Sequence, residues 1–264
     1  MLTPERDAHL NLIDSSRQLF QLDPCAEIET GDGWVFGAGR SPHPLISNAA
    51  FRADDALDPP ELVARARDFF AARDRGFALW VRAGVAADRD LIDAAEEAGL
   101  QPAYEMPEMV LSGRAEERPP ADGVELRRVT SAAGADEYWR VATAAYASIG
   151  FPPEIFAFYE SHAGLTAGNA AAFLAHLDSR PAGIAMTIVS HGVAGVYWVG
   201  TSEEARGRGL GWTMTAAAVN AGFDMGAEIA SLQASSMGES LYRKMGFETI
   251  FSYRLLLCAW GEER

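Results

Sequence analysis

Residues 206–211 read Arg-Gly-Arg-Gly-Leu-Gly and lie between two apolar runs of different character. The β-branched and aromatic run at 196–199 is typical of a strand, and the Ala- and Met-rich run at 212–225 is typical of a buried helix. Glycine tolerates left-handed backbone angles and lets a ligand approach the main chain, and a helix N-terminus presents unpaired N–H groups. The stretch therefore predicts an anion site, and a polyphosphate suits it.

Three kinds of glycine-rich phosphate loop compete for this stretch. A nucleoside-triphosphate loop needs Gly-x-x-x-x-Gly-Lys-Ser/Thr, and no Lys follows these glycines. A dinucleotide loop needs Gly-x-Gly-x-x-Gly, but its last position falls on Trp212 or Met214. What remains is Arg-x-x-Gly-x-Gly, with Arg206, Gly209 and Gly211 at the defined positions. This spacing resembles the coenzyme A pyrophosphate loop of the GCN5-related N-acetyltransferase (GNAT) family.

A second motif follows at the distance that the family requires. A strand is predicted at 228–234, and residues 239–247 resemble the family's short helix ending in Leu-Tyr-x-x-x-Gly-Phe. In the family the two strands splay, and the pantetheine arm of the cofactor lies between them. The resemblance implies that Tyr242 faces the thioester sulfur and acts as the general acid that protonates the departing thiolate, a role that a phenol can fill.

The resemblance also assigns the cofactor-binding residues, with acetyl-CoA as cosubstrate and no metal. The strand before the loop would pair with pantetheine and hold the acetyl carbonyl, and Gly200 would permit a bulge or a close approach there. Ser235 stands where the family often places an Asn that contacts the cofactor. The expected set is Val199, Gly200, Thr201, Arg206, Gly207, Arg208, Gly209, Leu210, Gly211, Trp212 and Ser235.

No general base transfers from the family pattern. Many members carry a Glu on the strand before the loop or on the strand after the long helix, but residues 193–201 contain no carboxylate and the second position falls on Ala230. Proton removal through ordered water is one alternative. The candidates by elimination are Glu160, His176, His191 and Tyr197.

The first half of the chain repeats the order of elements of the second half without its chemistry. Ala98-Gly99-Leu100 follows a short predicted helix, as Met245-Gly246-Phe247 does, and both are followed by extended segments. Counting back from the glycine, Ala95 stands where Tyr242 stands, and no Arg-x-x-Gly-x-Gly precedes. We therefore expect an internal duplication whose first copy is degenerate and has a structural or pocket-shaping role.

The expected fold is α/β, with two tandem GNAT-like acyl-CoA N-acyltransferase domains, each a mixed sheet flanked by helices. The boundaries are a degenerate domain at 1–112, a linker at 113–123 that combines Pro, Gly and charge, and a catalytic domain at 124–264. Helices are predicted at 5–20 and 135–149. A further helical piece carries Phe156, Phe158 and Tyr159, in the region that shapes the acceptor pocket in the family.

Composition limits the partners. Asp and Glu outnumber Lys and Arg by 37 to 22, for a net charge of -15, which disfavours binding to nucleic acid. No apolar stretch approaches membrane-spanning length, and the N-terminus has acidic residues where a signal peptide has basic ones. Cys25 and Cys258 have no Cys or His neighbours at metal spacing, so reduced thiols in a cytoplasmic protein are expected.

The sequence thus predicts an acetyltransferase that acts on a primary amine of a small molecule or peptide. One alternative is a non-catalytic coenzyme A-binding or regulatory protein, which the absence of a base would favour. Another is an acyltransferase resembling a thiol synthase, which differs only in its acceptor. Association as a homodimer is left open.

Overall fold

The computed structural model describes residues 2–45, 47–156, 159 and 162–259. The chain forms two compact units: unit 1 contains Met1–Pro24 and Met109–Glu248, and unit 2 contains Cys25–Glu108 and Thr249–Arg264. This division differs from the expected boundaries at 1–112 and 124–264. The first 24 residues pack with the second half of the sequence, and the last strand packs with the first half.

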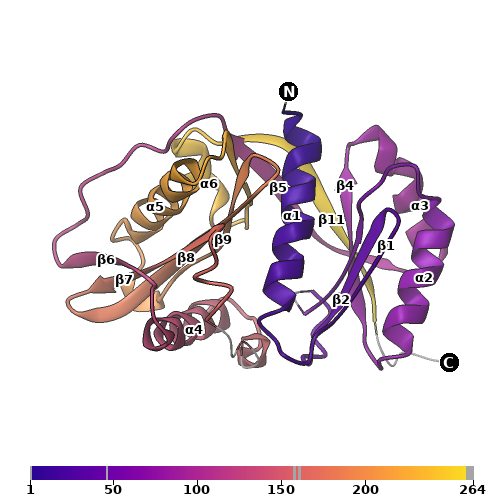
Figure 1. Ribbon diagram of the computed structural model, residues 1–264, viewed down its shortest axis with the longest axis horizontal. Coiled ribbons are helices and arrows are strands. Elements are labelled where there is room, and N and C mark those ends of the chain that lie inside the picture. The colour runs from indigo at the N-terminus through magenta and orange to yellow at the C-terminus, as the bar shows by residue number, and fades with distance from the viewer. Residues whose placement is uncertain (1, 46, 157–158, 160–161, 260–264) are drawn as a thin grey trace. The chain divides into compact units, whose positions relative to one another are not determined.

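Unit 1 is built on a mixed sheet in the order β10-β9-β8-β7-β6 (Figure 1). Neighbouring strands from β6 to β9 are antiparallel, whereas β10 is parallel to β9. This confirms the α/β class with a mixed sheet. The strands are β6 (Val124–Arg128), β7 (Ala170–Leu177), β8 (Arg180–Ser190), β9 (Val193–Thr201) and β10 (Ile229–Gln233).

Helices cover both faces of this sheet, and alternate residues of strand β9 contact helices on opposite faces. Its residues Ala194 and Val196 share a buried apolar cluster with helix α5, whereas Gly195 and Tyr197 face helix α1. The alternation follows from the two-residue period of a strand. The helices and 3-10 turns are α1 (Pro4–Phe20), α4 (Ala132–Ala147), η2 (Pro153–Ile155), η3 (Glu203–Ala205), α5 (Leu210–Asp224) and α6 (Glu239–Lys244).

The predicted helical piece around the aromatic residues after α4 is shorter than expected. Within the described residues this region contains only the 3-10 turn η2, which ends at Ile155, and Tyr159 lies outside any helix. Phe158 and Glu160 are outside the described residues. Two prolines precede the turn, and Pro lacks the N–H that a helix interior uses.

The predicted linker is fixed to helix α5. The main-chain N–H of Ala115 donates to Asn220 Oδ1 at 2.9 Å, and Asn220 Nδ2 donates back to the carbonyl of Ala115 at 3.1 Å. The guanidinium of Arg118 lies 3.3 Å above the ring of Trp212, in the first turn of α5. Its Pro- and charge-rich composition suggested a free linker, but this part of it is docked.

Unit 2 has the strand order β1-β2-β3-β4-β11-β5, with helices α2 and α3 packed on one face around a Phe-rich core (Figure 1). Strand β11 runs antiparallel to β4, so the end of the chain completes this sheet. The polar strand β1 was not predicted. The elements are β1 (Glu27–Gly31), β2 (Trp34–Ala38), β3 (Asn48–Arg52), α2 (Pro59–Ala71), β4 (Phe77–Ala83), η1 (Ala86–Asp88), α3 (Arg89–Glu97), β5 (Gln101–Leu111) and β11 (Glu248–Cys258).

Candidate active site

Strands β9 and β10 separate part-way along their length. They pair in parallel from Val193 with Ile229 to Gly195 with Ser231. Beyond that point β9 continues to Thr201 and β10 to Gln233. Main-chain groups that leave a parallel ladder are free to pair with something extended between the strands. The fork therefore has the form that the sequence predicted for the pantetheine arm.

A β-bulge lies on β9 just beyond the fork. Tyr197 pairs with Met186, and Gly200 pairs with Ile184, so Trp198 and Val199 together oppose a single residue of β8. Trp198 has a positive φ of 53°, which costs about 1 kcal/mol or more for a residue with a Cβ. Bulges of this kind redirect main-chain groups beside active sites.

Of the two alternatives expected at Gly200, a bulge or a close approach, the structure has the close approach, and the bulge is formed by the two residues before it. Register with β8 determines the bulge, and a single strand's sequence does not reveal that register. Gly200 is required for a different reason. A Cβ there would lie 3.1 Å from Cβ of Ala145 and 3.4 Å from Cε2 of Tyr146, so glycine lets α4 approach β9 closely.

The glycine-rich loop leaves open space in front of its main chain. Gly207 and Gly209 have φ of 76° and 81°, and nothing lies within 4 Å of a Cβ built at either position. Gly209 is the N-cap of the 15-residue helix α5. A left-handed main chain at the positive end of a helix, with free space before it, fits a phosphate group.

Other predicted members of the phosphate site have different surroundings. The side chains of Leu210 and Trp212 are buried, and the indole N–H of Trp212 donates to the carbonyl of Glu116 at 2.9 Å. Only the main chain of these two residues can therefore face a ligand. Arg206 donates through Nη2 to Ser148 Oγ at the end of α4, whereas Arg208 is exposed.

Two further predicted residues lie at the ends of the two fork strands, Ser235 just after β10 and Thr201 at the end of β9. The Ser235 hydroxyl accepts the main-chain N–H of Gly238 at 3.2 Å, so it keeps its own hydrogen available to donate. Thr201, at the end of β9, is partly exposed and pairs with Gly183 of β8. Val199 and Gly211 are partly exposed as well.

Tyr242 lies on α6 with only 7% of its surface exposed. Its ring rests over Gly238, where a Cβ would come within 2.7 Å of Cε2 of the tyrosine, so glycine provides the room. Burial raises the pKa of Tyr242 to about 12, and the neighbouring Thr215 hydroxyl partly offsets that rise. The phenol is thus a neutral O–H donor throughout the physiological range. Its counterpart Ala95 is fully buried in the core of unit 2.

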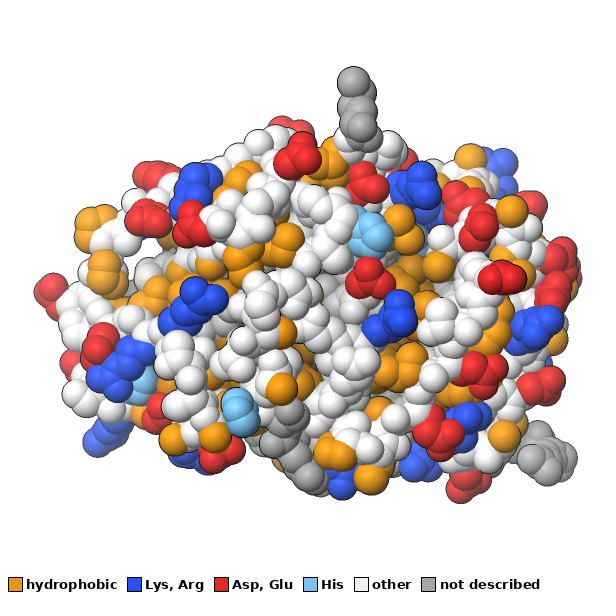
Figure 2. Space-filling model, in the orientation of Figure 1, with side chains coloured by type: hydrophobic (Ala, Val, Ile, Leu, Met, Phe, Trp, Pro, Cys, Tyr) orange, Lys and Arg blue, Asp and Glu red, His pale blue; other side chains and the backbone are white. Residues whose placement is uncertain are grey.

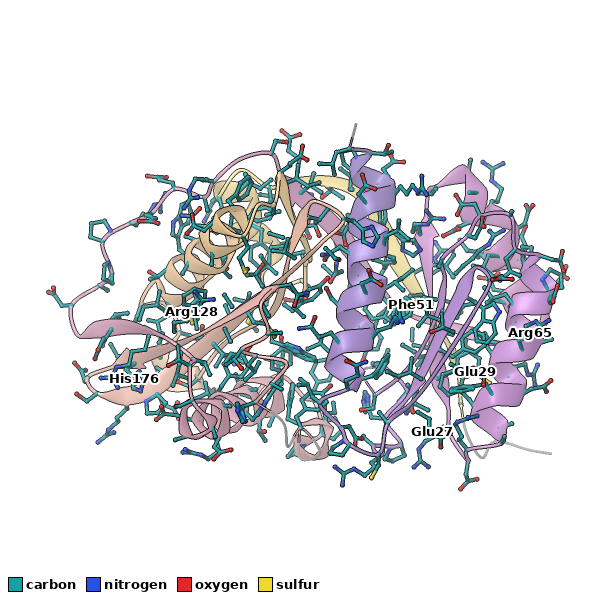
Figure 3. All side chains as sticks on the ribbon, in the orientation of Figure 1. Glu27, Glu29, Phe51, Arg65, Arg128 and His176 are labelled. Atoms are coloured by element: carbon teal, nitrogen blue, oxygen red, sulfur yellow. The ribbon has the colours of Figure 1, made fainter. Side chains whose placement is uncertain are left out.

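Neither histidine candidate for the general base lies at the bulge, and the third described candidate, Tyr197, directly precedes it. His191 Nε2 contacts Asp14 Oδ2 at 2.8 Å, in the turn before β9, roughly 20 Å along the strand from Trp198. His176 is two strands away from β9 at the end of β7 (Figure 3), and its Nε2 lies 3.4 Å from Glu137 Oε2. The remaining two candidates are Tyr197, whose hydroxyl donates to Asn11 Oδ1 at 2.7 Å, and Glu160, which is outside the described residues.

An aromatic cluster surrounds the bulge on the α4 side. The ring centroid of Trp198 is 4.9 Å from Phe156, 5.5 Å from Tyr146 and 6.5 Å from Tyr159. Tyr146 also contacts the strand at Gly200, as described above. We call these four residues the aromatic wall. The region expected to shape the acceptor pocket therefore joins the bulge through apolar rings.

The corresponding loop of unit 2 is acidic, and one of its carboxylates, Asp55, is ion-paired with Arg82 at 2.5 Å. The loop between β3 and α2 contains Asp54, Asp55 and Asp58, and the Asp58 side chain caps α2 by accepting from Glu61 N–H. The buried guanidinium of Arg52 donates to the Ala87 carbonyl at 2.7 Å. Carboxylates repel an anion, and this loop is stabilised by contacts within the protein.

The described part of the chain has neither a cluster of metal-ligating side chains nor a helix that could cross a membrane. Its His, Cys, Asp and Glu residues include no group of three or more arranged to hold a metal ion. Its helices include none with the length and apolar character needed to cross a membrane.

Residues 113–235 match the family model described as an acetyltransferase (GNAT) domain. This part of the chain is therefore a GNAT acetyltransferase domain. With this domain the protein is an N-acetyltransferase, an enzyme that transfers an acyl group from an acyl-coenzyme A. The match includes the fork strand β9 and the glycine-rich loop, and it ends at Ser235, before Tyr242.

Solved structures with the GNAT fold resemble the whole chain. A GCN5-related N-acetyltransferase from Kribbella flavida is 24% identical, with 96% of each chain covered and a TM-score of 0.70. One from Sphaerobacter thermophilus is 13% identical, over 97% of this chain and 93% of that one, with a TM-score of 0.64. A tandem GNAT protein from the clavulanic acid biosynthesis pathway is 13% identical, over 95% and 96%, with a TM-score of 0.61. Because their sequence identities are below 25%, these structures show that the fold is shared and no more. No curated protein matches the sequence.

Proposed function

We propose that unit 1 transfers the acetyl group of acetyl-CoA directly to a primary amine, with Tyr242 as the general acid. The observation that carries the proposal is the alignment, within one unit, of the β9–β10 fork, the open loop at 206–211 and the buried phenol. Unit 2, with an acidic loop and Ala95, is proposed to be non-catalytic.

The main chain of residues 207–212 would hold the pyrophosphate, because it combines open glycines with the N-terminus of α5. Arg208 would add its charge at the surface, and Arg206 would brace the loop against Ser148. The N–H groups that leave the ladder at Val199 and Gly200 would hold the acetyl carbonyl and stabilise the negative charge that develops on its oxygen.

Bound acetyl-CoA supplies the thioester bond that the amine breaks. The amine nitrogen would form the amide C–N bond with the acetyl carbon as the C–S bond breaks, and Tyr242 would give its proton to the departing sulfur. The amine would lose its proton to solvent, and the tyrosinate would regain a proton from solvent before the next turnover. Because burial keeps the phenol neutral, the donor is present at every turnover. The alternative of a coenzyme A-binding protein without turnover uses the same loop but has no need of this phenol.

The aromatic wall favours an acceptor whose amine is attached to an apolar, flat body. Aromatic faces bind apolar rings and also attract ammonium groups. Figure 2 shows acidic and basic side chains interspersed over the face that it presents. The test is a comparison of phenethylamine with spermidine as acceptors, measured as thiol release and as acetylated product. We expect kcat/KM to favour phenethylamine about tenfold.

If spermidine is the better substrate, the proposed class of acceptor is wrong, but the proposed acetyltransferase activity is retained. If no primary amine is acetylated although coenzyme A binds, the non-catalytic alternative is favoured. A thiol acceptor in place of an amine would support the thiol-synthase alternative, and cysteamine, which carries both groups, distinguishes N- from S-acetylation by its product.

The pH dependence should reflect the amine itself. Both histidine candidates lie away from the bulge and the Tyr197 hydroxyl donates to Asn11, so we propose that the acceptor loses its proton to solvent and that kcat/KM rises about tenfold per pH unit up to the pKa of each amine. Because the pKa of Tyr242 is raised to about 12, the phenol keeps its proton up to about pH 11. While the protein is folded, we therefore expect no loss of activity at any pH between neutral and about 11. If kcat/KM instead rose through the same pKa near pH 6–7 for amines of different pKa, that would indicate a general base on the protein.

A further inference from the structure

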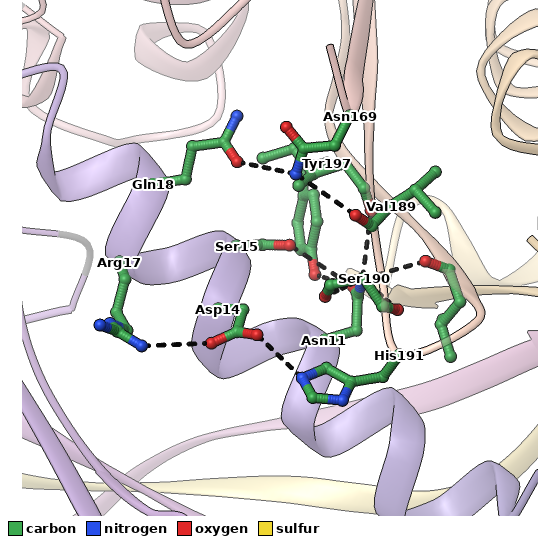
Figure 4. A network of polar contacts seen from close by, with 12 residues as sticks. Asn11, Asp14, Ser15, Arg17, Gln18, Asn169, Val189, Ser190, His191 and Tyr197 are labelled. Carbon is green, nitrogen blue, oxygen red and sulfur yellow. Dashed lines mark hydrogen bonds and ion pairs between the residues drawn. The ribbon is translucent and has the colours of Figure 1, made fainter. Parts of the chain in front are cut away.

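Helix α1 contributes a buried amide to the strand that carries the bulge (Figure 4). Asn11 is fully buried, and its Nδ2 donates to the carbonyl of Ile188 at 3.1 Å and of Val193 at 3.0 Å. It also donates to the Oγ of Ser190 at 3.0 Å. These contacts hold the end of the β8–β9 hairpin, which is the start of β9.

The other end of the same amide reaches further along β9. Asn11 Oδ1 accepts the hydroxyl of Tyr197 at 2.7 Å. Each end of the amide has a partner of the right kind. Carbonyl oxygens can only accept hydrogen bonds, so they pair with the NH2 group of Asn11, and its oxygen accepts the hydroxyl hydrogen of Tyr197. Buried groups of this kind are costly if one partner is removed.

The sequence makes room for this contact. A Cβ at residue 195 would lie 2.1 Å from Asn11 Oδ1 and 2.5 Å from the hydroxyl of Tyr197, so only Gly195 allows the phenol to lie back over the strand. Gly195 is also the last residue of β9 that pairs with β10. Tyr197 forms the last pair with β8 before the bulge. The Asn11 amide thus bonds both the part of β9 that pairs with β10 and Tyr197, the residue just before the bulge.

We propose that Asn11 and Tyr197 are positioning residues for the acetyl-binding main chain at Trp198–Gly200. The left-handed backbone conformation of Trp198 persists only if neighbouring contacts hold it in place. The Asn11 amide provides such a contact, because it holds Tyr197, the residue immediately before Trp198. Helix α1 lies outside the residues that match the family model, so this part of the site comes from a segment at the start of the chain. The inference rests on the proposed function, in which this main chain holds the acetyl carbonyl.

Tyr197→Phe tests the inference because it removes one hydroxyl and keeps the ring. The control is Gln18→Ala, which breaks a different anchor of the same helix: Gln18 Nε2 donates to the Gly164 carbonyl at 3.2 Å, and Asn169 Nδ2 donates to Gln18 Oε1 at 3.1 Å. The readouts are kcat with the best amine, the affinities for acetyl-CoA and for coenzyme A by calorimetry, and the melting temperature.

For Tyr197→Phe we expect kcat to fall about 10- to 100-fold, since small misplacements of reacting groups have effects of this size. Coenzyme A affinity should stay within about twofold, while acetyl-CoA loses any advantage over it. Gln18→Ala should change neither. The inference is overturned if Tyr197→Phe keeps both kcat and the acetyl-CoA preference, if Gln18→Ala loses as much, or if both affinities fall together. A wild type that binds coenzyme A but acetylates no amine would refute the proposed function, and the two affinities would still test Tyr197.

Discussion

Gly209→Glu is expected to abolish coenzyme A binding. The φ of 81° at this N-cap disfavours any residue with a Cβ by about 1 kcal/mol. The larger effect is electrostatic, because the new carboxylate would occupy the open space at the positive end of α5 and repel the pyrophosphate. We expect affinity to fall roughly 100-fold or more, which corresponds to about 2.7 kcal/mol, in a calorimetric titration.

The matched control is Gly226→Glu. Gly226 has a φ of 96°, is exposed and also has nothing within 4 Å of a built Cβ, so it imposes the same backbone strain and the same charge. It follows the other end of α5, about 22 Å away. Coenzyme A affinity should be retained in this variant. Equal losses in the two variants would show that strain, and not the phosphate site, accounts for the effect.

Tyr242→Phe should reduce turnover about 10²- to 10⁴-fold, the usual contribution of a general acid. The ring and its edge contact with Phe247, at 5.9 Å between centroids, are kept, so stability and coenzyme A affinity should change little. The measurement is kcat with the amine that the wild type uses best, with chemistry shown to be rate-limiting.

Tyr138→Phe is the control for removing a buried hydroxyl. Tyr138 is fully buried in α4, and its hydroxyl has no hydrogen-bond partner among the described residues, so its loss should leave kcat unchanged. If Tyr242→Phe retains more than about half of wild-type turnover, the phenol has a packing role, and the non-catalytic alternative gains weight.

Local patterns in the sequence were sufficient for the elements around the site. The glycine loop, the helix that follows it and the short helix with Tyr242 were predicted because their signals lie within a few residues of one another. The structure has α5 at Leu210–Asp224 and α6 at Glu239–Lys244. The roles of these residues in binding and catalysis stay predictions.

Features set by distant contacts were not predicted. The bulge at Trp198 depends on the register of β9 with β8, and the pattern of one strand does not contain it. The apolar face of α1 indicated a buried helix but not which sheet it covers, and it packs on β8 and β9 of unit 1. The polar residue Asn11 on that face was a signal, since a buried amide needs specific partners.

The most direct test of the account is the stoichiometry of coenzyme A binding to the full chain. Among the described residues, only 206–211 combine open glycines with a helix N-terminus, and the corresponding loop of unit 2 carries Asp54, Asp55 and Asp58. A calorimetric titration should therefore give one coenzyme A per chain in the wild type and none in Gly209→Glu. Two molecules per chain, or one that still binds to Gly209→Glu, would contradict the assignment of the site.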